Sequence, residues 1–139
     1  MGNLDSSSAS LRIVGDALNP AEISGLLSAE PSVAYLKGDI YHFKTGSAVR
    51  KSGMWSLKVT DRHPGDLDGQ CVEILDRLTD DEAIWKDLSV RFKIDIFVGL
   101  FMDGSNEGVT VSPETMERIG RRGIRLNLCL YAPTESETA

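Results

Sequence analysis

The stretch Gly53-Met54-Trp55-Ser56-Leu57-Lys58-Val59-Thr60 decides how this chain is expected to fold. From Trp55 onward, apolar and polar side chains alternate, so that Trp55, Leu57 and Val59 share one face. A period of two is typical of a strand with one face on a core and the other in water. Trp55 is therefore expected to anchor the core, directly after a basic loop that contains glycines.

Other segments show the same alternation, namely residues 9–14, 90–101 and 124–131. A short returning strand is expected at residues 109–111. Strands of a parallel sheet that is buried on both faces are continuously apolar, whereas alternation favours antiparallel strands with one covered face. The sequence therefore predicts an α+β fold: a mostly antiparallel sheet with helices packed on one face, related to ferredoxin-like split units.

Capping residues mark the expected helices. Asn19-Pro20 and Ser112-Pro113 each place a polar N-cap before a proline at the first helical position. The first of these helices is expected to end at Pro31. A further helix from Leu67 is interrupted or extended at Thr79-Asp80-Asp81-Glu82, whose first and last residues fit a capping box.

The length of 139 residues indicates a single domain, which we place at residues 9–132. The polar ends, residues 1–8 and 133–139, are expected to be disordered tails.

The net charge is −6, and residues 61–90 alone hold nine acidic and three basic residues. An acidic chain without a basic stripe is poorly suited to nucleic acid. Neither a bilayer-spanning run nor a secretory signal is visible, so we expect a cytoplasmic protein that does not bind membranes.

No catalytic or metal-binding motif stands out in the sequence. His42 and His63 fall in predicted loops, and Cys71 lies on the apolar face of a helix, where a thiol is usually inert. The acidic stretches 66–69 and 103–107 lack the ligand spacing of a calcium loop. We therefore expect no catalytic residue, no metal and no cofactor. The two widely spaced cysteines suit a reducing compartment.

Residues 37–52 are basic and are interpreted as a loop or a ragged hairpin. Residues 37–58 hold five basic residues against Asp39, a net charge of +4. The glycines here do not match a phosphate-binding loop, because the required lysine and helix do not follow them. The candidate ligand-binding residues are the cationic groups and the adjacent tryptophan: Lys37, His42, Lys44, Arg50, Lys51 and Trp55. The alternative is a solvated surface loop.

Several short motifs, taken in order, resemble a bacterial family known as domain of unknown function 4279. They are Ser10-Leu11-Arg12-Ile13-Val14-Gly15, Asn19-Pro20, Pro31, Lys37-Gly38-Asp39, Gly53-Met54-Trp55 and Ser112-Pro113-Glu114. The resemblance covers nearly all of residues 9–131. It implies a small bacterial cytosolic protein. It transfers no catalytic residue, because the family has no established activity.

Two kinds of function agree with these features. The first is a non-enzymatic protein-interaction or regulatory module, of which an immunity-type role is one version by analogy. The second is an anion- or phosphate-binding enzyme or sensor that uses the basic loop, which would require its cations to converge on one pocket. A symmetric homodimer is also expected. The short strand at residues 109–111 would leave an unpaired edge beside strand 90–101, and Phe97 and Phe101 add apolar surface on the face opposite the helices.

Overall fold

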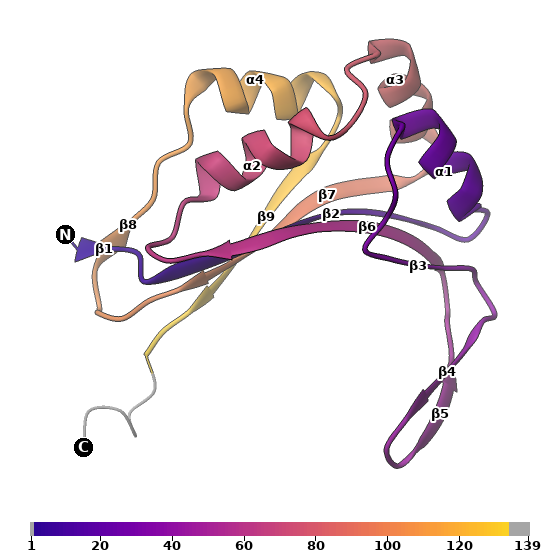
Figure 1. The fold of residues 1–139 in the computed structure, drawn as a ribbon, viewed down its shortest axis with the longest axis horizontal. Helices are drawn as coiled ribbons and strands as arrows, with labels where there is room; N and C mark the ends of the chain where they lie inside the picture. Colours follow the sequence, from indigo (N-terminus) through magenta and orange to yellow (C-terminus); the bar gives the residue numbers. More distant parts are fainter. Residues whose placement is uncertain (1, 134–139) are drawn as a thin grey trace.

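The computed structural model describes residues 2–133 and shows a five-stranded sheet with four helices on one face (Figure 1). The strands of this sheet are β2 (Ser6–Gly15), β3 (Val33–Tyr35), β6 (Gly53–Arg62), β7 (Lys93–Phe101) and β9 (Arg125–Tyr131). Their order is β3-β6-β2-β7-β9, and every neighbouring pair is antiparallel except β7 and β9. The predicted α+β class, with helices on one face of a mostly antiparallel sheet, is confirmed.

Two of the helix caps expected from the sequence are confirmed. The helices are α1 (Pro20–Leu27), α2 (Leu67–Asp76), α3 (Glu82–Arg91) and α4 (Pro113–Arg121). The Asn19 side chain accepts hydrogen bonds from two N–H groups in the first turn of α1. The Ser112 hydroxyl accepts one from Thr115 N–H, at 3.2 Å, in the first turn of α4. Among the helices of the described residues, none combines the length and the apolar character needed to cross a membrane.

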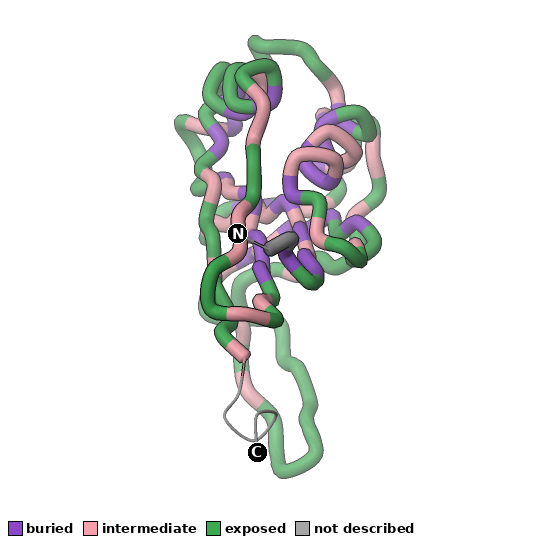
Figure 2. The backbone as a smooth tube through the Cα atoms, turned by 90° about the vertical axis from the view of Figure 1, so that its left-hand side faces the viewer, coloured by how far each residue is buried: buried purple, intermediate pink, exposed green. Residues whose placement is uncertain are grey.

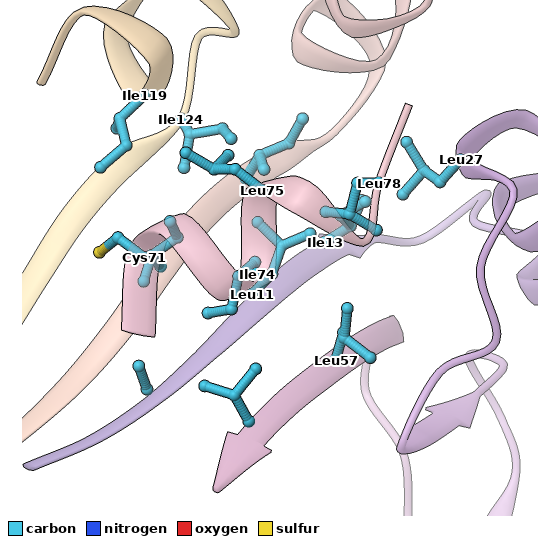
Figure 3. Close-up of a cluster of buried hydrophobic side chains, with 14 of the residues drawn as sticks. Leu11, Ile13, Leu27, Leu57, Cys71, Ile74, Leu75, Leu78, Ile119 and Ile124 are labelled. Atoms are coloured by element: carbon cyan, nitrogen blue, oxygen red, sulfur yellow. The ribbon is translucent and has the colours of Figure 1, made fainter. Parts of the chain in front are cut away.

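The core lies between the sheet and the helices (Figure 3). Leu11 and Ile13 of β2 are fully buried and face α2, which contributes Ile74. Trp55 of β6 is also fully buried, and its indole N–H donates to the Ser24 hydroxyl at 3.0 Å. The alternation of β6 therefore predicted the position of Trp55 correctly.

The prediction of a disordered tail at residues 1–8 is wrong, because β2 already begins at Ser6. The Ser7 hydroxyl is buried and donates to the side-chain oxygen of Gln70 at 2.6 Å. This partner lies 63 residues further along the chain, so the local composition does not reveal it. Residues 134–139 of the other predicted tail lie outside the described residues.

The predicted start of the longest strand is also wrong. The α3 helix continues to Arg91, and Val90 is a helical residue that is 81% exposed, so β7 begins only at Lys93. The N-cap of α3 is Asp81, not Thr79. The alternation of residues 90–101 includes Val90, but a single apolar residue at the boundary between two elements fits the end of a helix and the start of a strand equally well.

Two shorter predictions are corrected as well. The α1 helix stops before Pro31, because Ser28 adopts a left-handed φ of 58° that ends it. No strand forms at residues 109–111; instead β8 (Glu107–Gly108) pairs in parallel with β1 (Gly2–Asn3). The free edge expected beside β7 is therefore absent, since β2 and β9 flank β7 on its two sides.

The region predicted as a loop or ragged hairpin forms a regular hairpin of β4 (Ile40–Phe43) and β5 (Gly46–Val49). This hairpin belongs to neither of the other sheets. It projects from one end of the large sheet, away from the helices (Figure 1). Residues 36–52, which include the hairpin and its base, are called the arm below.

Candidate functional site

The arm exposes apolar side chains on both of its faces. Ile40 pairs with Val49 on one face, and the two residues are 64% and 57% exposed. Tyr41 and Phe43 lie on the other face with ring centroids 6.0 Å apart, and Phe43 is 50% exposed. Figure 2 shows the arm as an exposed loop of chain that extends away from the buried core. Within the described residues, these side chains are therefore left largely to solvent.

Hydrogen bonds close the base of the arm. Arg50 N–H donates to the Asp39 carbonyl at 2.7 Å, and Gly38 N–H donates to the Arg50 carbonyl at 2.8 Å. Gly38 has a φ of 92°, a conformation that a larger residue adopts only with strain. The Asp39 carboxylate also accepts the N–H of Leu36 at 2.8 Å. Together these contacts brace the turn from which the hairpin leaves the sheet.

An ion pair joins the base of the arm to the turn after β2. Lys37 Nζ lies 3.1 Å from Asp16 Oδ2, and the Ser52 hydroxyl donates to Asp16 Oδ1 at 2.9 Å. The hydrogen bonds from Lys37 and then Ser52 lower the pKa of Asp16. Lys37 and Asp16 are both more than half exposed, so the pair contributes little to stability. It nevertheless gives the Lys37 ammonium group a partner within the protein.

The guanidinium of Arg50 is sandwiched between two tyrosine rings. Its central carbon lies 3.9 Å from the ring centroid of Tyr35 and 3.8 Å from that of Tyr41. Tyr35 is itself fixed, because its hydroxyl donates to the Met54 sulfur at 3.6 Å. Cation–π contact on both faces orients the guanidinium and leaves its N–H edge open. Among the described residues, the Arg50 side chain makes no ion pair or hydrogen bond.

A hollow of about 440 Å³ lies beside this sandwich, at the base of the arm. Tyr35, Tyr41, Arg50 and Lys51 are among the residues that line it. Of the six ligand-binding candidates, the structure brings only Arg50 and Lys51 to this hollow. The hollow thus offers two cationic groups beside two aromatic rings, an arrangement suited to a carboxylate or another anion.

The other four candidates lie elsewhere. Lys37 is held by Asp16, His42 lies on β4, and Lys44 follows β4 in the exposed turn of the hairpin. Trp55 is fully buried in the core and is not exposed to a ligand at the arm. The six residues therefore do not converge on one pocket.

Sequence reasoning missed the two tyrosines that hold Arg50. Arg50 lies fifteen residues after Tyr35 and nine after Tyr41, and the three residues come from different strands or their ends. The only local signal is the aromatic run that contains Tyr41, within the stretch interpreted from the sequence as a loop or a ragged hairpin. The pairing register that brings the rings to Arg50 cannot be read from that run.

A second polar cluster lies on the sheet face opposite the helices, and its charges are paired internally. Arg12 donates two hydrogen bonds to Asp95, at 2.9 and 2.6 Å, and Asn127 donates a third at 2.6 Å. Burial acts to raise the pKa of Asp95, but the hydrogen bonds from Arg12 and Asn127 outweigh it, and the pKa lies below its usual value. The Arg12 guanidinium also lies 4.4 Å from the Phe97 ring centroid. This cluster links β2, β7 and β9.

The described residues bring together no set of catalytic groups. Cys71 is fully buried, and burial raises the pKa of its thiol to about 12, so it is not a reactive thiolate. His42 and His63 lie in different places, one on the arm and one in the turn after β6. No group of three His, Cys, Asp or Glu side chains within residues 2–133 is arranged to hold a metal.

Comparison with known proteins identifies the family of the chain. A family model described as "Domain of unknown function (DUF4279)" matches residues 5–133. The chain belongs to this family, and the match includes the start of β2 that the sequence interpretation had assigned to a tail. A search of curated proteins and a search of solved structures each gave no match.

Proposed function

We propose that this protein is a non-enzymatic protein-interaction or regulatory module that binds its partner with the arm. The observation that carries the proposal is the braced hairpin, from which Ile40, Tyr41, Phe43 and Val49 project into solvent. An isolated two-stranded hairpin is marginally stable in water, and the contacts of this one with the rest of the protein lie at its base, where Arg50 packs between Tyr35 and Tyr41. A partner that covers the arm removes this apolar surface from water, which is the main favourable term in protein association.

The partner surface that fits the arm is apolar with an acidic group near the base. Arg50 and the tyrosines are residue types that dominate interface hot spots. The open edge of the Arg50 guanidinium is able to donate two hydrogen bonds to one carboxylate of the partner. Because Tyr35 and Tyr41 already orient this guanidinium, binding costs little side-chain entropy.

Binding of this kind suits a protein that acts by covering another protein's surface. A regulatory protein or an immunity-type protein works in this way, and the second is an analogy from mode of action. Cys71 and Cys129 are both free thiols, which fits the reducing cytoplasm of a bacterial cell.

Affinity purification with arm variants tests the proposal. The chain is used as bait in three forms, the parent, Ile40→Ser and Phe43→Ser, and a fourth, Val90→Ser, serves as the control. Val90 is 81% exposed on α3 and is not part of the arm. A specific partner is expected with the parent and with Val90→Ser, and its recovery should fall at least about tenfold with the arm variants. Equal recovery with all four baits would contradict a role for the arm.

An anion sensor is a second candidate function. The observation that favours it is that Arg50 and Lys51 line the same hollow. The hollow lacks one usual component of a phosphate site, because no residue from the first turn of a described helix lines it. A carboxylate presented by a protein therefore fits the site better than free phosphate does, and a thermal-shift experiment described below separates the two.

A further inference from the structure

The two edges of the large sheet differ. On one side the edge strand is β3, which has three residues; on the other it is β9, which has seven. Monomeric proteins usually protect an edge strand with charged side chains or proline. Residues 126–131 of β9 contain neither. Among residues 2–133, no strand pairs with the outer side of β9.

The direction of the main-chain groups on β9 follows from one hydrogen bond. Met102 N–H donates to the Tyr131 carbonyl at 2.9 Å, so the polar groups of Tyr131 point toward β7. In a strand, successive residues direct their N–H and C=O groups to opposite sides. The polar groups of Leu126, Leu128 and Leu130 therefore point outward, to the free edge.

The side chains of these leucines form an apolar row along the same edge. Leu126, Leu128 and Leu130 are in register with the buried residues of β7, so they lie on the helix side of the sheet. Leu128 and Leu130 are nevertheless 45% and 63% exposed. A second strand placed beside β9 would satisfy the main-chain groups and cover these leucines at the same time.

We propose that the β9 strands of two copies of this chain pair antiparallel about a two-fold axis at Leu128. Leu128 then lies opposite its own copy, and Leu126 lies opposite Leu130 of the second copy. These are the residues whose N–H and C=O groups point outward, so each opposed pair exchanges two hydrogen bonds. The two sheets join into one sheet of ten strands.

The other face of β9 is also compatible with this register. Asn127 lies opposite Cys129 of the second copy, and Arg125 lies opposite Tyr131 of the second copy. Arg125 is the one charged residue of β9, and it meets an aromatic ring rather than a like charge. In this dimer the two arms lie at opposite ends of the joined sheet, because each arm connects β3 to β6 at the far side of its own subunit. The dimer is thus bivalent for a partner of the arm, although the pairing of β9 does not depend on that function.

Sedimentation of the purified chain alone tests the dimer. Because the interface is small, we expect reversible association with a micromolar dissociation constant, seen as a shift from 15.2 kDa to twice that mass between about 5 and 500 µM. Leu128→Lys places two ammonium groups against each other on the axis and should weaken association at least about tenfold. Val33→Lys, an exposed valine on the opposite edge strand β3, is the matched control and should associate like the parent. A parent chain that stays monomeric over this whole concentration range overturns the proposal. It is overturned equally if the edge of β9 pairs with a peptide strand while the chain itself stays monomeric.

A disulfide experiment tests the register. In the proposed dimer Asn127 faces Cys129 of the second copy as a non-hydrogen-bonded pair, whose Cα atoms lie about 4.5 Å apart and within disulfide range. Asn127→Cys should therefore form a covalent dimer on mild oxidation. Arg125→Cys moves the new thiol two residues along the same face, opposite Tyr131 instead, and should cross-link far more slowly. Equal cross-linking by the two variants, or faster cross-linking by Arg125→Cys, excludes the register centred on Leu128.

Discussion

The carboxylate of Asp68, in the first turn of α2, accepts a hydrogen bond from the N–H of Ser112, the N-cap of α4, at 2.9 Å. One acidic side chain thereby joins two helices that are 44 residues apart in the sequence. This main-chain hydrogen bond is the chief reason that the pKa of Asp68 lies below its usual value, with smaller contributions from Thr115 and from the Ser112 hydroxyl.

A pH dependence of stability follows. Because the pKa of Asp68 in the folded protein is below its ordinary value of 3.8, the carboxylate stabilises the fold above that pH. The contribution is lost as the pH falls below 3.8 through the lowered pKa. Asp68→Asn should therefore reduce the free energy of unfolding near pH 7, and the difference from the parent should shrink as the pH falls below 3.8. Urea unfolding at several pH values measures this difference; a difference that stays constant with pH would contradict the linkage.

The burial of Trp55 leads to a prediction about stability. Trp55 is fully buried and donates to Ser24, so Trp55→Ala removes a large core side chain and leaves the Ser24 hydroxyl without this donor. The free energy of unfolding is expected to fall by about 3–5 kcal/mol. Ser24→Ala removes only the hydrogen-bond partner and should cost about 1 kcal/mol. Chemical denaturation of the two variants measures both values, and similar costs for the two would show that Trp55 is not a packing anchor.

The fold could be predicted from the sequence wherever the signal was local. The alternation from Trp55 to Val59 and the caps at Asn19 and Ser112 each depend on residues within one turn or one strand, and all were correct. The errors arose where distant residues decide the structure. Ser7 enters the core through Gln70, and no feature of the N-terminal sequence shows that contact.

The candidate site could be predicted only in part, for a related reason. Charge counting located the basic region, but it does not show which cations have partners. Lys37 is neutralised by Asp16, whereas Arg50 is held by two rings that leave its donors open. This difference depends on strand register and on the turn after β2, neither of which is encoded near those residues. For the same reason Trp55, adjacent to the loop in sequence, is separate from it in space.

Removal of the Arg50 side chain should loosen the arm without unfolding the protein. Arg50→Ala removes both cation–π contacts, each worth about 0.5–1 kcal/mol at an exposed site. Amide hydrogen exchange in β4 and β5 is expected to accelerate, while exchange in β2 and β7 stays as in the parent. Arg50→Lys keeps the charge but not the planar stacking and should restore the protection only in part. Unchanged exchange in β4 and β5 would mean that main-chain bonds alone order the arm.

Phosphate should not bind the arm specifically. Arg50 and Lys51 line the hollow, but the N-terminal turn of a helix, which completes many phosphate sites, does not. Added phosphate is therefore expected to change the melting temperature no more than chloride at equal ionic strength. A ligand that binds the folded state raises the melting temperature by mass action. A phosphate-specific increase that Arg50→Ala abolishes would favour the anion sensor over the interaction module.

The exposed apolar residues of the arm should contribute almost nothing to the stability of the isolated chain. Ile40 is 64% exposed on β4, whereas Ile23 on α1 is fully buried, so the two isoleucines form a matched pair. Ile23→Ala is expected to lower the free energy of unfolding by about 2–5 kcal/mol, because it opens a cavity in the core. Ile40→Ala should stay within about 0.5 kcal/mol of the parent, as surface substitutions do. A contiguous patch of exposed apolar residues that is dispensable for folding, here Ile40, Phe43 and Val49 of the arm, is expected to serve contact with a partner, whereas a single exposed residue such as Val90 is not. If chemical denaturation gave a large loss for Ile40→Ala, the arm would have to pack within the monomer, and the case for its role in binding would fail.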